Sequence, residues 1–318
     1  MSEAVAKQKR GFHLFPHRGN VFQDDPKGQV FFLLLLLIPL AQFAIFYFAV
    51  NFNSILLAFK SYDNSTGVIV QNWVGWANFE EIFRLFKTED TLWICLRNSA
   101  IYFALDFVIG APVTLLFAYY IYKGYPLHEF FKVMLFLPSI ICSMVFVIFY
   151  KNFIEAFAWT YNVESGTLIG DKNIGMWFIA LFYVWLLFSG NILIYLNAMG
   201  SVSKSTVEAA QVDGASELQT FFHVMIPGIW PTIVSLVVIS FGQIMVNQAN
   251  LYGLFGNNAP KQFWTLGYYL FRLVAITGAD SPTSYPLASA FGLLGTAIIA
   301  PLTFLVRYLM QRFGPRED

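Results

Sequence analysis

Long uncharged stretches dominate the sequence and alternate with short charged segments. Six of these stretches contain a single charged residue between them, Asp106. A helix needs ~20 apolar residues to cross the hydrocarbon core of a bilayer, and a charge at mid-bilayer costs roughly 2.5–3.5 kcal/mol. The pattern therefore predicts an all-α polytopic membrane protein with six transmembrane helices. They are expected near residues 29–50, 98–122, 133–150, 174–198, 229–250 and 285–309.

The first apolar stretch invites comparison with a signal peptide. Its apolar region, Val30 to Val50, is too long for the hydrophobic part of a signal peptide, and no small-x-small cleavage site follows it. We interpret it as an uncleaved first span. The uncharged run continues to Phe59, so this helix is expected to extend beyond the membrane.

Basic residues set the predicted orientation. With a cytoplasmic N-terminus, eleven Lys and Arg side chains lie on the cytoplasmic side and eight on the outer side, as the positive-inside rule favours. Six spans also place the C-terminus, with Arg307, Arg312 and Arg316, in the cytoplasm. We expect an N-terminal tail over 1–28, a membrane domain over 29–310 and a C-terminal tail over 311–318.

Composition agrees with a lipid environment. Hydrophobic residues make up 57% of the chain and charged residues 12%, about half the charged share of a soluble domain. This excludes a soluble enzyme, a disulfide-rich module and a disordered chain. The 19 basic residues balance the 19 acidic ones, so no net field attracts nucleic acid. Cys95 and Cys142 are far apart and are interpreted as packing residues, and the histidines show no metal-binding spacing.

The loop between the fourth and fifth spans has the pattern of two short capped helices. Ser205 and Glu208 match a capping box for a helix over Thr206–Val212, with Gly214 as its left-handed end. Ser216 to Gln219 repeats the capping box, and Pro227 is expected to end the second helix. Two interpretations follow: a rigid element that transmits force, or an amphipathic helix on the lipid headgroups.

Polar side chains recur along the fifth span with helical spacing. Ser240, Gln243, Asn247 and Asn250 are separated by three, four and three residues, and Gln248 lies beside them. This spacing predicts one polar helical face, and amides both donate to and accept from sugar hydroxyls. We interpret the stripe, with Asn191 of the fourth span as a weaker candidate, as a pathway for a polar solute. The alternative is hydrogen bonding between helices.

Asp106 is a functional-site hypothesis because it is the only charged residue within the expected spans. It could face a solvated cavity, pair with a partner subunit, or lie protonated against a neighbouring helix. A structural or cavity-lining role is favoured over a proton relay, since no second ionisable residue lies within a span.

The loop sequence resembles the EAA loop of ABC importer permeases. Glu208-Ala209-Ala210, two further residues and Asp213-Gly214-Ala215 are followed by Ile226-Pro227 and Pro231. Other segments are similar to this family in order and spacing, and the resemblance extends from residue 29 to about 310. These segments are Asn72 to Phe79, Arg97-Asn98-Ser99 and Phe136-Leu137-Pro138. The chain departs from the family pattern in Trp76 and Met225, where leucine is commoner.

The resemblance implies a permease subunit, most similar to the maltose or oligosaccharide type, in a bacterial plasma membrane. It implies a second permease, two cytoplasmic ATPases that bind ATP and Mg²⁺, an extracellular solute-binding protein and a carbohydrate cargo. Residues 200–227 would form the coupling loop. Its ATPase contacts would be Glu208, Ala209, Ala210, Asp213, Gly214 and Ala215. The chain has no GxxxxGK[ST] sequence, so it is not expected to be its own ATPase by that route.

Two other classes of function remain as alternatives. A secondary carrier or channel working without ATPases is expected to have ion-coupling carboxylates or an internal repeat, and the sequence has one intramembrane carboxylate and no convincing repeat. A membrane receptor or scaffold leaves the polar stripe of the fifth span unexplained.

Overall fold

The computed structural model describes residues 26–63, 70–161, 167–172, 174–276 and 284–315. Residues 1–25 and 316–318 of the expected tails lie outside this range. The chain divides into two units, residues 1–54 and 55–318, each of which is described by itself.

The described part of the first unit, residues 26–54, is helical. Helix α1 (Pro26–Phe43) passes through the π-helical turn η1 (Ala44–Ala49) into α2 (Val50–Leu57), which continues past the boundary of the unit. The 25-residue stretch Leu33–Leu57 is long and apolar enough to cross a membrane. Its apolar side chains point outward on all sides, as in a helix that faces lipid or a partner.

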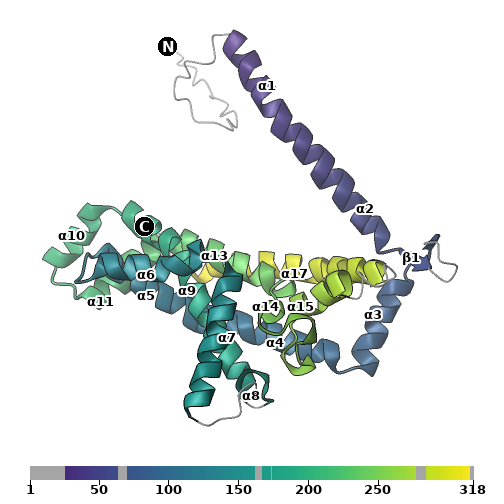
Figure 1. The fold of residues 1–318 in the computed structure, drawn as a ribbon. Helices are drawn as coiled ribbons and strands as arrows, with labels where there is room; N and C mark the ends of the chain where they lie inside the picture. Colours follow the sequence, from purple (N-terminus) through teal and green to yellow (C-terminus); the bar gives the residue numbers. More distant parts are fainter. Residues whose placement is uncertain (1–25, 64–69, 162–166, 173, 277–283, 316–318) are drawn as a thin grey trace, which may run out of the picture. The chain divides into compact units, whose positions relative to one another are not determined.

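The second unit begins with a hairpin and continues as a helical bundle (Figure 1). Strands β1 (Lys60–Asp63) and β2 (Val70–Trp73) pair antiparallel, with Lys60 opposite Trp73. The elements that follow, with 3-10 and π-helical turns labelled η, are α3 (Ala77–Thr88), α4 (Thr91–Leu105), η2 (Asp106–Gly110), α5 (Ala111–Tyr122), α6 (His128–Ile140), α7 (Ser143–Thr160), α8 (Thr167–Gly170), α9 (Gly175–Ser201), α10 (Lys204–Val212), α11 (Glu217–Thr220), η3 (Phe221–Met225), α12 (Ile226–Gly228), α13 (Trp230–Gly242), η4 (Gln243–Met245), α14 (Leu251–Phe255), η5 (Gly256–Asn258), η6 (Lys261–Phe263), α15 (Leu266–Phe271), η7 (Arg272–Ile276) and α17 (Tyr285–Phe313).

Four helical stretches of the described chain are each long and apolar enough to cross a membrane. Two further pairs of helices qualify only together, because each pair is sharply bent. The all-α polytopic prediction is confirmed, whereas the count of six requires each bent pair to be one span and stays a prediction. The single stretches are Leu33–Leu57, Thr91–Tyr122, Gly175–Ser201 and Tyr285–Phe313.

The expected third span, 133–150, is not one helix. Helices α6 and α7 meet at 105°, and the chain between them is extended at Ile141. Pro138 has no N–H for the last turn of α6, which weakens the helix just before the bend. Helix α7 then leaves the bundle and carries α8 near its far end (Figure 1). Its buried side chains pack against α9 and α14.

The expected fifth span, 229–250, is shorter than predicted. Regular structure ends at Met245, so Asn247 and Asn250 do not continue the helical face of Ser240 and Gln243. The Asn247 side chain accepts a hydrogen bond from the Ala249 N–H at 2.9 Å, which competes with helix formation. Ala249 and Asn250 then adopt positive φ angles.

The loop between α9 and α13 confirms one predicted capping box and corrects the other. Helix α10 begins at Lys204 rather than Thr206, so Ser205 lies inside it and caps nothing; its hydroxyl contacts that of Ser203 at 2.7 Å. The Ser216–Gln219 box is formed. Pro227 does not end the second helix.

The second helix of the loop instead continues to Gly228 and bends by 71° into α13. The π-helical turn η3 ends at Met225, two residues before Pro227. Its wider turn accommodates the proline ring, which clashes with the preceding turn of a regular α-helix.

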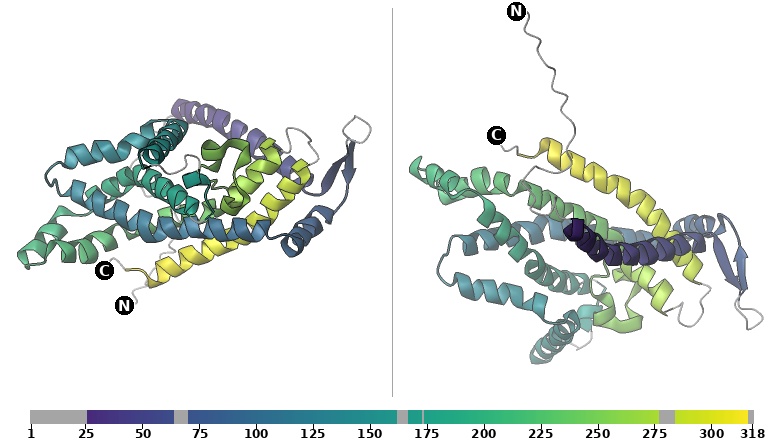
Figure 2. Two further views of the ribbon diagram at one scale, coloured as in Figure 1. Left: turned by 60° about the horizontal axis from the view of Figure 1, so that its bottom comes forward. Right: turned by 90° about the horizontal axis from the view of Figure 1, so that it is seen from above.

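Two hydrophobic cores lie one after the other along the bundle of the second unit. The hairpin-end core gathers around α4, α7, α14, α15 and the first half of α9, with Tyr102, Phe182 and Tyr268 among its buried residues. The loop-end core joins α5, the second half of α9 and residues 221–237, with Tyr195 and Met225 at its centre. Helix α9 and the α4–α5 stretch contribute residues to both cores, and they pack against each other (Figure 2).

Candidate functional site: a polar cavity and an exposed loop

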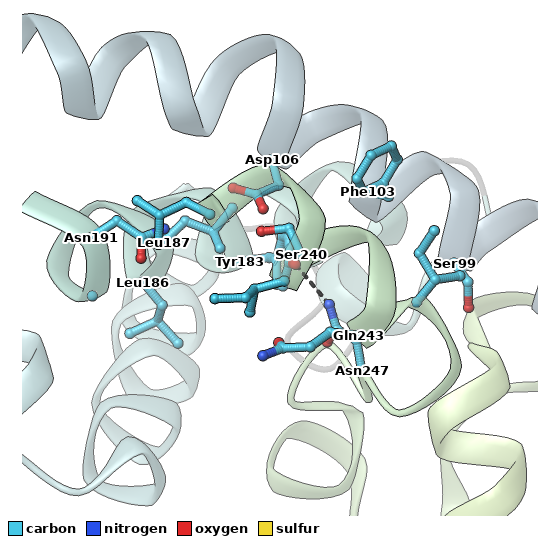
Figure 3. Close-up of a pocket in the computed structure, with 14 residues that line it drawn as sticks. Ser99, Phe103, Asp106, Tyr183, Leu186, Leu187, Asn191, Ser240, Gln243 and Asn247 are labelled. Carbon is cyan, nitrogen blue, oxygen red and sulfur yellow. Dashed lines mark hydrogen bonds between the residues drawn. The ribbon is translucent and has the colours of Figure 1, made fainter. Parts of the chain in front are cut away.

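A polar cavity of about 220 Å³ lies where the two cores meet (Figure 3). Its walls come from the α4–α5 stretch, α9, and the end of α13 with the chain that follows. Fourteen residues line it, and none of them is Lys, Arg or His. Its polar residues are Ser99, Asp106, Tyr183, Asn191, Ser240, Gln243 and Asn247.

Asp106 opens the π-helical turn that separates α4 from α5. Its side chain packs against Gly110 in the next turn, where an added Cβ would lie 2.9 Å from the Asp106 Oδ1. Ser240, on α13, lines the same cavity as this carboxylate. Asp106 faces Ser240 across the cavity (Figure 3). It is only 7% exposed and forms no ion pair with any described residue.

Asn247 reaches the cavity from the chain that follows η4. Its Nδ2 donates to the Tyr183 hydroxyl at 2.7 Å, and its backbone carbonyl accepts from the Thr265 hydroxyl at 2.7 Å. Gly267 approaches this backbone so closely that an added Cβ would lie 2.6 Å from the Asn247 oxygen. These contacts give Asn247 a structural role at the point where the helix ends.

The amides of Asn191 and Gln243 are the free polar groups of the cavity. Within the described chain, neither side chain makes a hydrogen bond, and Gln243 is exposed. They are therefore available to water or to a polar solute, to which each offers a donor and an acceptor.

The structure brings together four of the predicted pathway residues: Asn191, Ser240, Gln243 and Asn247. Gln248 and Asn250 do not line the cavity. Tyr183 was missed by the sequence analysis. It lies eight residues before Asn191, and this helical spacing along α9 is the signal that could have found it.

The α10–α11 loop presents most of the predicted ATPase-contact residues to solvent. Glu208, Ala209, Asp213 and Gly214 are exposed, while Ala210 and Ala215 are half-buried. Gly214 has a φ of +80°, and the Ala215 N–H donates to the Ala210 carbonyl at 3.0 Å. The turn between the two helices is therefore a hydrogen-bonded helix end that requires a left-handed residue.

Two apolar residues of this loop also point outward. Val212 is 87% exposed and Leu218 is 66% exposed. The sequence analysis assigned contacts only to the EAA motif and missed both. Apolar residues at the tip of a polar loop are the signal, because exposed apolar side chains gathered together mark a contact surface.

A three-residue contact anchors the loop to the end of α5. The Tyr119 hydroxyl donates to Glu217 Oε2 at 2.8 Å, and Lys123 Nζ lies 3.0 Å from the same oxygen. The Tyr119 ring also contacts Phe221 with centroids 4.9 Å apart. The Tyr119 hydrogen bond, with help from Lys123, holds the pKa of Glu217 below its usual 4.5.

The Arg97-Asn98-Ser99 segment holds the chain between α14 and α15. The fully buried Asn98 side chain donates to the carbonyls of Gln262 and Trp264 at 2.8 and 2.9 Å. The Ser99 hydroxyl accepts from the Leu266 N–H at 2.9 Å. This motif therefore fixes the wall of the cavity rather than binding a solute through Asn98.

The Asn72–Phe79 segment makes a similar structural contact at the hairpin. The Asn78 side chain donates to the carbonyls of Ala58 and Lys60 at 2.8 and 2.7 Å. Gly75 turns the chain with a φ of +60°. The motif closes the β-hairpin onto the start of α3.

The sequence matches the family model described as binding-protein-dependent transport system inner membrane component over residues 100–318. It is 24% identical over 295 residues to the polygalacturonan/rhamnogalacturonan transport system permease protein YteP of Bacillus subtilis, covering 89% of this chain and 88% of that protein. It is 30% identical over 168 residues to the arabinooligosaccharides transport system permease protein AraP of Halalkalibacterium halodurans, covering 47% of this chain and 50% of AraP.

The fold is similar to that of a solved transporter chain. The crystal structure of a bacterial alginate ABC transporter, in complex with an alginate pentasaccharide-bound periplasmic protein, superposes with a TM-score of 0.69. The match covers 91% of this chain and 97% of the transporter chain at 18% identity. At that identity the likeness concerns the fold alone.

Proposed function

The chain belongs to the family of binding-protein-dependent transport system inner membrane components, and from this premise we propose that it is a permease subunit of an ATP-driven carbohydrate importer. As a family member with several membrane-spanning helices, it is a multi-pass protein of the inner membrane. The proposed importer contains a second permease, two ATPases and an external solute-binding protein. An oligosaccharide is the proposed cargo, because similar proteins are named as transport permeases for polygalacturonan/rhamnogalacturonan and for arabinooligosaccharides.

The observation that carries this proposal is the exposed α10–α11 loop. It presents the EAA residues together with Val212 and Leu218, and it continues through α12 into α13, whose end lines the cavity. A partner that moves the loop therefore pulls directly on one wall of the cavity. The capping box and the Glu217 contact make the loop rigid enough to transmit that movement.

The proposed mechanism is alternating access. The partner ATPases bind ATP and Mg²⁺ and close, the loops move with them, and the cavity opens toward the binding protein; hydrolysis resets the assembly. This chain makes and breaks no covalent bond, but shifts the balance between two conformations. Asn191, Gln243 and Ser240 are the proposed solute contacts, with Asn247 positioned beside them.

Purification of the tagged chain from its own membranes tests this function. Two ATPase polypeptides and a second permease are expected to co-purify. Recovery of the folded chain alone would rule out the importer and favour a carrier or channel.

A matched pair of substitutions then tests the loop as the ATPase contact. Val212→Ser removes an apolar side chain from the exposed tip of the loop and is expected to lower ATPase recovery severalfold. Val70→Ser makes the same change at an exposed position of β2 and is expected to leave recovery unchanged. Equal recovery in the two variants counts against the loop as the docking site.

A further inference from the structure

The electrostatic character of the cavity is set by one side chain. Asp106 is the one charged residue among the fourteen that line it, and no lysine, arginine or histidine of the described chain pairs with its carboxylate. The carboxyl lies beside Ser240 in a polar cavity that is large enough for water (Figure 3), so solvent in the cavity can hydrate its charged form. The cavity of this chain is therefore a site of negative potential.

A negative site in a low-dielectric wall treats solutes differently according to charge. Two like charges repel far more strongly here than in bulk water, because the surrounding protein and lipid screen them poorly. An uncharged sugar meets no such repulsion. Its hydroxyls can donate to the carboxylate, while the free amides of Asn191 and Gln243 donate to and accept from others.

The proteins that this chain resembles are named for both charged and uncharged carbohydrates. Alginate is described as an acidic polysaccharide, and polygalacturonan carries a carboxylate on each galacturonate unit, whereas arabinooligosaccharides are uncharged. Building on the proposed function, we propose that Asp106 makes the pathway selective against anions, so that the cargo is an uncharged or amine-bearing carbohydrate and not a polyuronate.

Charged thiol reagents test this selectivity without knowledge of the cargo. Cysteine is placed in the cavity as Gln243→Cys or Asn191→Cys in a Cys142→Ser background, since Cys142 is exposed and Cys95 is buried. The full complex in membrane vesicles is reacted with a cationic and an anionic methanethiosulfonate of similar size. Asn72→Cys, on the exposed strand β2, gives the reference ratio of the two rates, which removes the intrinsic difference between the reagents.

At the cavity positions, the cation-to-anion rate ratio is expected to exceed the reference ratio by about tenfold. Asp106→Asn should bring it close to the reference, Asp106→Glu should retain it, and neither should change the ratio at Asn72→Cys. Because the complex includes the second permease, the measurement also reports any charge that subunit contributes.

A ratio equal to or below the reference at both cavity positions would overturn the proposal. So would a ratio unchanged by Asp106→Asn, or the failure of both cysteines to react with either reagent. If Asp106→Asn does not assemble, the ratio in the chain with intact Asp106 still decides. The proposed function is judged separately, by whether ATPases co-purify.

Discussion

At the scale of single residues, the cavity depends on a glycine beside its carboxylate. A Cβ at Gly110 would lie 2.9 Å from Asp106 Oδ1 and 3.1 Å from Leu187 Cδ1. Gly110→Ala is therefore expected to lower stability by about 1–3 kcal/mol through overpacking, measured as a lower Tm of the purified complex. Gly200, near the end of α9, has no atom within 4 Å of an added Cβ. Gly200→Ala should leave Tm unchanged or raise it slightly, and an equal loss in both variants would contradict the packing argument.

A second glycine controls the shape of the loop. Gly214 has open space around an added Cβ, but its φ of +80° is strained for any side chain and most of all for a β-branched one. Gly214→Val is expected to distort the turn, so that the chain stays in the membrane while solute transported per ATP hydrolysed falls severalfold. Gly200→Val, at a helical position without positive φ, is the control. Unchanged transport in Gly214→Val would count heavily against the loop as the coupling element.

At the scale of elements, the loop is attached to the bundle at two places. One is its continuation into α13, and the other is the contact of Glu217 with Tyr119 and Lys123 on the last turn of α5 and just after it. Since α5 follows the turn that carries Asp106, and α13 carries Ser240, the loop is connected to both the Asp106 side and the Ser240 side of the cavity. Displacement of the loop is therefore expected to move both walls of the cavity.

The Glu217 contact has a definite pH dependence. Because the pKa of Glu217 is lowered in the folded protein, its stabilising effect is fully present above about 4.5 and is lost as pH falls through the lower folded value. Hydrogen exchange of residues 204–220 should accelerate in that acidic range in the unmodified chain. Glu217→Gln should accelerate it already at neutral pH and remove the acid dependence.

Glu81→Gln is the matched control for this measurement. Glu81 forms an ion pair with Arg84 on α3, far along the chain from the loop. Loss of this ion pair should leave hydrogen exchange in residues 204–220 unchanged. If Glu217→Gln also leaves exchange unchanged at neutral pH, the contact with α5 does not restrain the loop.

At the scale of the whole molecule, the second unit consists of two apolar cores with a polar layer between them. Three segments form the walls of the cavity in this polar layer, and regular helix is interrupted in two of them. The π-helical turn η2 interrupts the α4–α5 stretch at Asp106, and α13 ends at Gln243. Irregular turns leave backbone groups less firmly bonded than continuous helix does, so bending is easiest there. The proposed alternating access would concentrate its movement at this level.

Much of this organisation could be predicted from the sequence because lipid imposes a local rule. Each membrane-spanning helix must satisfy its own backbone hydrogen bonds and present apolar side chains, so an uncharged stretch identifies a helix without reference to the rest of the chain. The Ser216–Gln219 capping box was also predictable from the sequence, because its two partners are only three residues apart in the chain. The grouping of Asn191, Ser240 and Gln243 followed from polar residues being rare in such stretches.

Only the tertiary structure decided where helices break and which distant residues meet. The α13 helix ends before Asn247 because Gly267 and Thr265 pack on that backbone, and the α6–α7 bend is matched to surfaces of α9 and α14. Tyr119 meets Glu217, and Asp106 lies beside Ser240, across about a hundred residues or more of chain. Hydrophobic patterning specifies whether each residue belongs in lipid, in water or in the protein interior. Many arrangements of the helices meet that requirement equally well. Close packing and paired polar groups select one of them, and these depend on residues that are neighbours in space alone.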